Sequence, residues 1–351
     1  MSDDETRASS AGSFVIRNSS FVIPSHVPID FPFRSDTLAA LSMSTQAIGI
    51  DFGGTSIKSA VVENGKIISR GPAIDTQKHL AAGTLFDAIF ENIATLRSAH
   101  PAVCAVGMGL PGFVDTVRGI VHGMANVPGW NEVPLLAMMR DRTGLACAIE
   151  NDANAMAYAE FVHGAAKGAT NAICITLGTG VGGGLILDGK LYRGSRFAAG
   201  ELGHSSIDLH GPRGVYGTPG DLEVYVGNRQ IGERAARLYN AAGKPRSAET
   251  CTPADLARLA AAGDTIAISL WDSIGTEIGA ALVNVVWLLN PDAIVIGGGV
   301  AAAGELVFAP IRRTLNDRTS VLFHEQLKIA AAQLGNDAGI LGCAELALAA
   351  R

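Results

Sequence analysis

Five side chains able to accept protons or hydrogen bonds stand out in this sequence, four of them in or close to glycine-rich stretches and the fifth, Asp152, directly before a helical pattern. They are Asp51, Asp152, Glu201, His204 and Glu223. Glu201 and His204 are three positions apart, so they share a face if the segment forms a helical turn. Carboxylates and a fixed imidazole suit a polyol, because a polyol presents many hydrogen-bond donors. The set therefore favours a site for a substrate rich in hydroxyl groups.

The first glycine-rich stretch predicts a turn that binds phosphate. Phe52-Gly53-Gly54-Thr55 interrupts a predicted strand at 46–51, and further strands are predicted at 57–62 and 66–68 around an Asn64-Gly65 turn. In a P-loop or a dinucleotide-binding GxGxxG motif a helix follows the glycines. Both of those interpretations fail here, because a strand follows.

The same layout recurs further along the chain. A strand is predicted at 171–176, a glycine turn at 177–184, a strand at 185–187 and a hairpin turn at Asp188-Gly189. This repeat predicts two related α/β lobes. Backbone N–H groups of both turns, with Gly178, Thr179 and Gly180 in the second, can then face one polyphosphate. The alternative is two ordinary hairpins with glycine-rich turns.

Two aspartates occupy places where chemistry on a phosphate is expected. Asp51 ends the first strand, where a carboxylate can hold magnesium through water or can form a simple Asx-turn. Asp152 lies between an apolar segment at 145–149 and a helical pattern at 155–162. It could merely cap that helix, but phosphoryl transfer to a hydroxyl needs a carboxylate that accepts the proton. Thr55 offers a hydroxyl to phosphate, while Lys58 faces either phosphate or solvent.

Composition limits the class of protein. The chain has 351 residues, of which 48% are hydrophobic and 17% charged, and a net charge of −6. It can bury a large core, and its charge attracts neither nucleic acid nor an anionic membrane. The five cysteines contain no CxxC pair and suit a reducing cytoplasm. The apolar stretch at 278–289 is too short and too interrupted to span a bilayer. Residues 1–44 are predicted to be a disordered tail, with Met43 as an alternative start.

Several motifs, in order, resemble the ROK family of sugar kinases, above all bacterial glucokinases. They are GIDFGGTSIK (49–58), ENDANA (150–155), LGTGVGGG (177–184), GELGH (200–204) and NPDAIVIGGGV (290–300). The resemblance extends from about residue 46 to the end of the chain. It implies an α/β fold of two actin-like (ribonuclease-H-like) lobes, with ATP and a sugar bound in the cleft between them.

The resemblance also implies roles for particular residues. Asp152 matches the catalytic base, and Asn151 would bond a neighbouring sugar hydroxyl. The residues matched to the sugar ring are Glu201, His204 and Glu223, with Gly112 and Asn126 close to the sugar. The residues matched to ATP are Asp51, Gly53, Gly54, Thr55, Lys58, Gly178, Thr179, Gly180, Gly298 and Gly299, with magnesium on Asp51.

The chain departs from the family pattern in one loop. Most ROK proteins hold this loop with a zinc bound by the GELGH histidine and three cysteines. Here the cysteine positions fall on Gly214, Tyr216 and Asp221, so a site with only His204 and perhaps Asp221 falls far short of four ligands and no structural zinc is expected. We expect Asp221 to accept a hydrogen bond from His204 instead, with Tyr216 covering the pair. The alternative is that Asp221 is a solvated loop acid.

These observations predict an ATP- and magnesium-dependent hexokinase that makes a hexose 6-phosphate, with glucose as the favoured sugar. An N-acetylhexosamine kinase or a fructokinase is the alternative within the family, and polyphosphate is an alternative donor. Two other classes are a sugar-responsive repressor, which would need an N-terminal helix-turn-helix, and a sugar-binding protein without activity. The predicted lobes are 45–150 with a C-terminal helix at about 338–351, and 151–337. The resemblance further suggests a cytoplasmic homodimer that binds no nucleic acid and no membrane.

Overall fold

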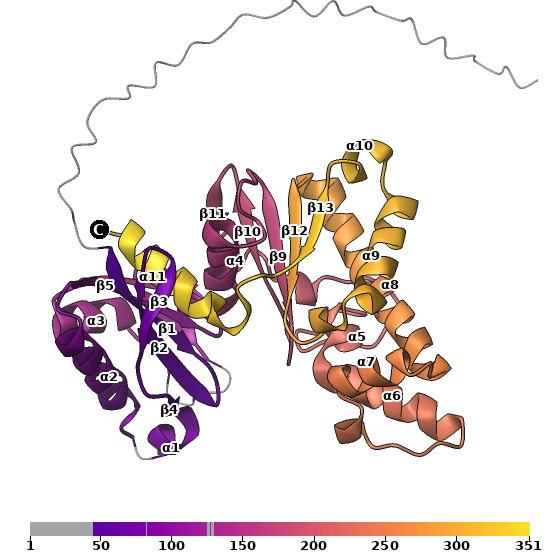
Figure 1. Cartoon of the computed structure of the whole chain (residues 1–351), viewed down its shortest axis with the longest axis horizontal. Helices are drawn as coiled ribbons and strands as arrows, with labels where there is room; N and C mark the ends of the chain where they lie inside the picture. Colours follow the sequence, from indigo (N-terminus) through magenta and orange to yellow (C-terminus); the bar gives the residue numbers. More distant parts are fainter. Residues whose placement is uncertain (1–44, 82, 125–126, 128–129) are drawn as a thin grey trace, which may run out of the picture. The chain divides into compact units, whose positions relative to one another are not determined.

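The computed structural model describes residues 45–351 except 82, 125, 126, 128 and 129, so the predicted tail lies outside the described residues. One large sheet has the strand order β3-β2-β1-β5-β8, with β4 paired to β2 (Figure 1). Strands β1 and β2 are antiparallel, whereas β1, β5 and β8 run parallel. The bounds are β1 Gln46–Phe52, β2 Ser56–Glu63, β3 Lys66–Arg70, β4 Ile74–Asp75, β5 Val103–Leu110 and β8 Ala146–Asn151.

The second large sheet repeats this arrangement, with the order β11-β10-β9-β12-β13. Its β9 and β10 form an antiparallel hairpin, and β9, β12 and β13 run parallel. The prediction of two related α/β lobes is therefore confirmed. The bounds are β9 Ala172–Leu177, β10 Val181–Leu187, β11 Lys190–Tyr192, β12 Ala293–Gly297 and β13 Lys328–Ala331, and a small separate sheet pairs β6 Phe113–Asp115 with β7 Ile120–Gly123.

The second glycine turn is shorter than the sequence suggested. Strand β10 begins at Val181, so Gly182, Gly183 and Gly184 belong to the strand. A Cβ at Gly184 would lie 2.5 Å from the Cβ of Ala157, a residue of helix α4 (Asp152–His163). Gly182 and Gly184 therefore permit the close packing of α4 on the sheet, Gly183 permits the close approach of the Gly200 carbonyl, and only residues 178–180 form the turn.

Two helices lie between the sheets. Helix α4 contacts β9 and β10, while α11 (Ala338–Ala349) contacts α4, β1 and β5 (Figure 1). A Cβ at Gly49 or Gly107 would collide with the backbone of α11, so glycine permits the close approach. On the first sheet pack α1 Thr76–Ala81, α2 Leu85–Ala99 and α3 Leu135–Thr143. The lobe boundaries at 150/151 and 337/338 remain a prediction.

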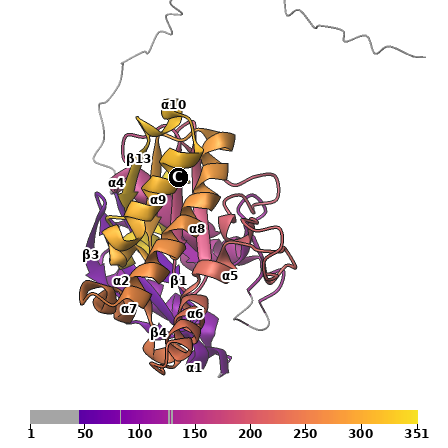
Figure 2. The same ribbon diagram turned by 90° about the vertical axis from the view of Figure 1, so that its right-hand side faces the viewer.

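A group of helices covers the second sheet on the side away from α4 (Figure 2). The longest, α8, packs against α9 and buries Trp271, Ile274 and Ile278. By length and composition α8 could cross a membrane, but half of its most apolar window is buried inside the protein, as in a core helix. The bounds are α5 Glu223–Val226, α6 Asn228–Ala241, α7 Pro253–Ala261, α8 Thr265–Leu289, α9 Glu305–Arg318 and α10 Val321–His324.

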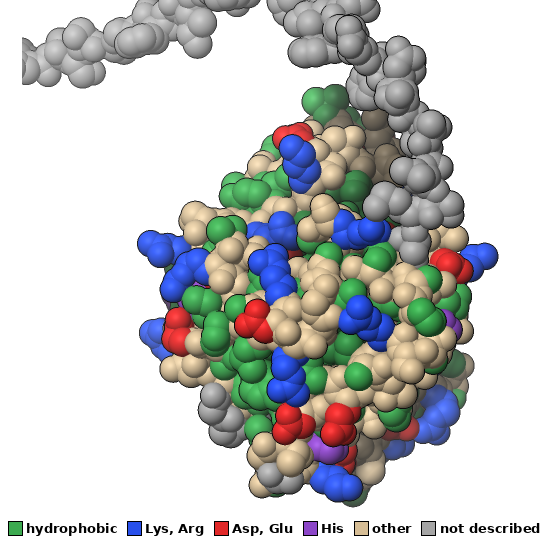
Figure 3. All heavy atoms as spheres, turned by 90° about the vertical axis from the view of Figure 1, so that its left-hand side faces the viewer, with side chains coloured by type: hydrophobic (Ala, Val, Ile, Leu, Met, Phe, Trp, Pro, Cys, Tyr) green, Lys and Arg blue, Asp and Glu red, His purple; other side chains and the backbone are tan. Residues whose placement is uncertain are grey.

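One face of the molecule, opposite these helices, carries basic side chains scattered singly among apolar and polar ones (Figure 3). This face shows no continuous basic band of the kind that tracks a nucleic-acid backbone.

Candidate active site

Side chains of helix α1 hold the first glycine turn in place. Thr76 donates its hydroxyl to the carbonyl of Gly53 at 2.8 Å, and Gln77 donates its amide to the carbonyl of Gly54 at 2.8 Å. The carbonyl groups of Gly53 and Gly54 accept these bonds, which hold the turn that ends at Thr55. Beside the turn, Asp51 on β1 stands opposite Lys58 on β2. Burial raises the pKa of Asp51, and the nearby Lys58 charge lowers it.

A cavity of about 570 Å³ opens next to this turn. Asp51 and Lys58 line it from the first sheet, so Lys58 faces the cavity. Gly298 and Gly299 line it from the loop after β12. Gly298 has φ +86°, and a Cβ there would collide with the carbonyl of Leu177, so this position requires glycine. The cavity joins residues predicted for ATP, whereas none of the residues predicted for the sugar lines it.

The second glycine turn is held by the segment that carries Glu223. The N–H of Asn228 donates to the carbonyl of Gly178 at 2.9 Å. The carboxylate Oε2 of Glu223 accepts the N–H of Val181 at 2.9 Å. A Cβ at Gly180 would lie 2.5 Å from that oxygen, whereas a Cβ at Gly178 would meet nothing within 4 Å. Glu223, expected at the sugar, therefore also touches the end of the phosphate turn.

Asn151, and not Asp152, is the residue that caps helix α4. Asn151 is the N-cap of α4, and its side-chain oxygen accepts the N–H of Asn154 at 3.0 Å. Asp152 is the first helical residue, and its Oδ1 accepts the N–H of Ala153 at 2.8 Å. Burial raises the pKa of Asp152 to about 6, and the negative charges of Asp51 and Glu201 act in the same direction. A carboxylate with a pKa near neutrality suits a general base.

The remaining residues predicted near the sugar are placed as follows. The amide of Asn151 donates to the carbonyl of Gly112 at 3.2 Å, which joins two of them. Gly112 has φ +107°, and a Cβ there would lie 2.5 Å from the carbonyl of Gly123, so glycine is required. Asn126 lies outside the described residues.

Sequence reasoning missed the support of this segment. Glu150 is buried, and its Oε2 accepts the Nε of Arg193 at 2.6 Å. Its Oε1 accepts the backbone N–H of Asn151 and the amide of Asn154, at 3.0 and 3.1 Å. Glu150 thus orients the residues on both sides of Asp152. The buried acid in ENDANA was visible in the sequence, but Arg193 carried no motif that could pair it with Glu150.

His204 lies between two carboxylates. Residues Leu202–His204 form a 3-10 turn, and the His204 Nε2 is 3.9 Å from Glu201 Oε2. The opposite nitrogen, Nδ1, is 3.7 Å from Asp221 Oδ2 and is buried without a hydrogen-bond partner within the described part of the chain. Asp221 is only 1% exposed, so the alternative of a solvated loop acid is wrong. The expected hydrogen bond between His204 and Asp221 is not formed at this distance.

The four positions of the family's zinc site do not suit a metal here. A Cβ at Gly214 would collide with the Asp221 carboxylate, which therefore fills the space beside Gly214. The Tyr216 ring meets the His204 ring edge-on, with centroids 4.8 Å apart. Tyr216 is 66% exposed and Asp221 is 1% exposed, so the covering of the pair by Tyr216 stays a prediction. In residues 45–351, as far as they are described, no group of three or more His, Cys, Asp or Glu side chains could hold a metal ion.

Comparison with known proteins gives one consistent family. A model of the ROK family matches residues 47–350. A glucokinase of Thermotoga maritima is 34% identical over 309 residues, which cover 85% of this chain and 96% of the relative. A structure of a ROK family glucokinase from Streptomyces griseus in complex with glucose and AMPPNP is 35% identical, with a TM-score of 0.71 and coverage of 86% and 98%. A xylose repressor of Caldicellulosiruptor bescii is 28% identical and is covered over 76% of its length.

Proposed function

The chain belongs to the ROK family and has its two-lobed, actin-like fold, and from this we propose that it transfers the terminal phosphoryl group of ATP to the 6-hydroxyl of a hexose, with glucose as the preferred sugar. The observation that carries the proposal is the state of Asp152. Its carboxylate is buried and free of any capping duty, and its pKa is raised to about 6. Near pH 7 it is mostly ionised and still basic enough to accept a proton from a hydroxyl.

In the proposed reaction Asp152 accepts the proton of the 6-hydroxyl as that oxygen attacks the terminal phosphorus of ATP. The bond from phosphorus to the bridging oxygen breaks, and ADP leaves. Asn151 and the set of Glu201, His204 and Glu223 hold the other sugar hydroxyls. Positioning and charge stabilisation supply most of the catalysis in phosphoryl transfer, so the main task of these side chains is to fix the 6-hydroxyl beside Asp152.

For ATP we propose the cavity lined by Asp51, Lys58, Gly298 and Gly299, with phosphates at the two glycine turns. Asp51 fits a magnesium ion held through water, because magnesium binds one or two carboxylates plus substrate phosphates. Magnesium would neutralise charge that develops on the phosphate oxygens. Zinc has no role in the proposal, because Asp221 fills the space beside Gly214 and no thiolate is present in the loop.

Several alternatives remain as outcomes of the test. The glucokinase relative and the glucose complex support glucose, whereas an N-acetylhexosamine or fructose would use the same acceptors. Similarity to a xylose repressor keeps a regulatory role in view. The raised pKa of Asp152 favours catalysis, because sugar binding alone does not need a base. We also propose a cytoplasmic homodimer that binds neither nucleic acid nor membrane.

The proposal is tested over glucose, mannose, fructose, N-acetylglucosamine and N-acetylmannosamine, with a coupled assay for ADP when ATP is the donor and direct detection of the sugar phosphate when polyphosphate is the donor. Phosphorylation of glucose by ATP, abolished in Asp152→Asn, is the expected result. Sugar binding without phosphorylation of any member of the panel would replace the enzyme with a binding protein. Turnover on another hexose with a far higher kcat/KM would change the substrate but keep the reaction.

A further inference from the structure

We propose that Arg234 is a positioning residue for this site: it fastens the short helix α5, whose Glu223 carboxylate fixes the second glycine turn and at the same time faces the sugar residues. The inference rests on the proposed function and assigns a role to an arginine outside every recognised motif. It follows that one carboxylate, that of Glu223, serves both the residues proposed for the sugar and the turn proposed for the phosphates.

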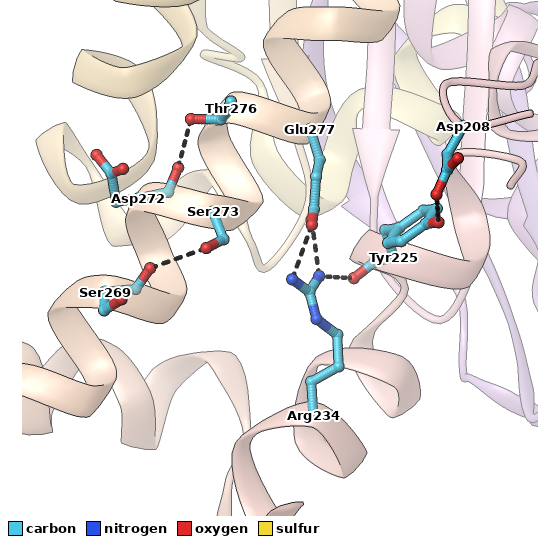
Figure 4. Close-up of polar contacts among 8 residues, drawn as sticks. All are labelled: Asp208, Tyr225, Arg234, Ser269, Asp272, Ser273, Thr276 and Glu277. Carbon is cyan, nitrogen blue, oxygen red and sulfur yellow. Dashed lines mark hydrogen bonds and ion pairs between the residues drawn. The ribbon is translucent and has the colours of Figure 1, made fainter. Parts of the chain in front are cut away.

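The first step is the attachment of α5. The Arg234 guanidinium makes two bonds to the Glu277 carboxylate of α8, at 2.7 and 2.8 Å. One of the same nitrogens also donates to the backbone carbonyl of Tyr225 in α5, at 2.7 Å (Figure 4). Arg234 and Glu277 side chains are 19% and 20% exposed. A bidentate, half-buried pair holds its geometry far better than a surface pair, so α5 is tied to two long helices.

The second step is the reach of α5 toward the turn. Glu223 begins α5, and its Oε2 accepts the N–H of Val181 at 2.9 Å. Val181 directly follows the turn of residues 178–180. Because the carboxylate is close to Gly180 as well, any shift of α5 moves the support of that turn.

The third step is the connection between α5 and the residues predicted for the sugar. Asp221 Oδ1 accepts the N–H of Val224 in α5 at 3.2 Å, and Asp221 Oδ2 lies 3.7 Å from His204 Nδ1, so α5 is joined to a residue predicted for the sugar. Burial raises the pKa of Glu201, and the Glu223 charge acts in the same direction. Tyr225 of α5 donates its hydroxyl to Asp208 at 2.9 Å, and this bond holds the loop that follows His204 (Figure 4). Helix α5 is therefore the common support of the phosphate turn, Glu223 and the loop beside His204.

The test measures coupling between the two ligands. Calorimetry gives the Kd of glucose with and without a non-hydrolysable ATP analogue, and the ratio of the two values is the coupling factor. We expect a wild-type factor of about 5 or more, since coupling between sites is commonly 5- to 150-fold. Arg234→Met should weaken binding of the analogue and bring the factor to within about twofold of one. The matched control is Arg229→Met on the same helix, whose pair with Glu233 is 74% exposed on the arginine side and should not matter.

A second variant separates positioning from folding. Arg234→Met leaves Glu277 unpaired and half-buried, which destabilises a protein. Arg234→Met combined with Glu277→Met leaves no orphan charge, so it should fold and still lose the coupling. A wild-type factor near one, or an unchanged factor in the folded double variant, would overturn the inference. Failure of the proposed function looks different: the wild type would phosphorylate no sugar, and Arg234→Met would still weaken binding of the analogue alone if the positioning role is correct.

Discussion

Asp152→Asn should remove the activity and make the protein more stable at neutral pH. The substitution keeps the side-chain oxygen that accepts the N–H of Ala153. It removes a negative charge from a buried place that also borders Asp51 and Glu201. Loss of a general base lowers the rate by about 10²- to 10⁴-fold, while the sugar contacts of the neighbouring residues stay in place.

The size of the stability effect follows from the pKa. The Asp152 pKa is raised from 3.8 to about 6, so the folded protein holds this proton more tightly than the unfolded chain. Between pH 4 and 6 the folded state therefore binds more protons, and its stability falls as the pH rises. At 1.36 kcal/mol per pKa unit, the loss above pH 6 amounts to about 3 kcal/mol. The asparagine variant avoids this loss, so its advantage over wild type should be absent near pH 4 and complete near pH 7.

The assay is urea unfolding of both proteins from pH 4 to 7.5, beside kcat/KM over the same range. Wild-type kcat/KM should fall about tenfold per pH unit below pH 6, since only the ionised base is active. Asp264→Ala is a control for which the expected change in stability has the opposite sign, because backbone N–H groups of α8 lower the pKa of Asp264. That variant should lose stability at neutral pH. A constant difference between wild type and Asp152→Asn at every pH would show that the Asp152 pKa is not raised, and near-normal turnover would remove Asp152 as the base.

Four further predictions concern the turn, the loop and the lobes. Gly178→Ala should fold normally, because its Cβ meets nothing within 4 Å, but should raise the KM for ATP and leave that for sugar; the reverse pattern would assign the turn to the wrong ligand. Elemental analysis should find no stoichiometric zinc, and activity should survive a chelator once magnesium is restored; one zinc per chain would refute this. Asp221→Ala should raise the sugar KM several-fold and the ATP KM by less, since its Oδ2 lies 3.7 Å from His204 Nδ1 while its Oδ1 accepts the N–H of Val224 in α5; equal effects on both substrates would contradict that role. Sugar binding should close the lobes, and identical scattering curves with and without saturating sugar would speak against closure.

The regular parts of the fold were predictable because local chemistry determines them. Asn64-Gly65 and Asp188-Gly189 adopt the positive φ values of a tight hairpin turn, from +50° to +71°. Alternating apolar residues and these turns were enough to predict both hairpins. The glycines at 182–184 were misassigned to a turn, because the groups that require them, α4 for Gly182 and Gly184 and the Gly200 carbonyl for Gly183, come from other parts of the sequence. A single sequence shows that a glycine is present but does not show which neighbour requires it.

The site was predictable only where a residue stands in a motif. Asp152 and His204 could be named, but their supports come from elsewhere in the chain: Arg193 is 43 positions from Glu150, and Arg234 is 43 positions from Glu277. Long-range ion pairs leave no periodic signal in one sequence. For Asp221, the position in the sequence suggested contact with His204. Its burial and the 3.7 Å distance between Asp221 Oδ2 and His204 Nδ1 could be known only from the structure.

The distribution of charge explains why the two halves of the site use different groups. The half proposed for the sugar has Glu201 and Asp221 on either side of His204, and burial, with the Glu223 charge acting in the same direction, raises the pKa of Glu201. Such a field repels phosphate, so polyphosphate is best held where side-chain charge is absent, positive or, as at Asp51, offset by the proposed magnesium. The two glycine turns offer backbone N–H groups, and Lys58 adds a cation at the cavity. Glu223 is the exception, because its Oε2 is already bound to the N–H of Val181 at the turn. This hydrogen bond stabilises the Glu223 charge between the proposed sugar site and the proposed phosphate site. In the proposed reaction, the 6-hydroxyl and the terminal phosphate meet at the same place.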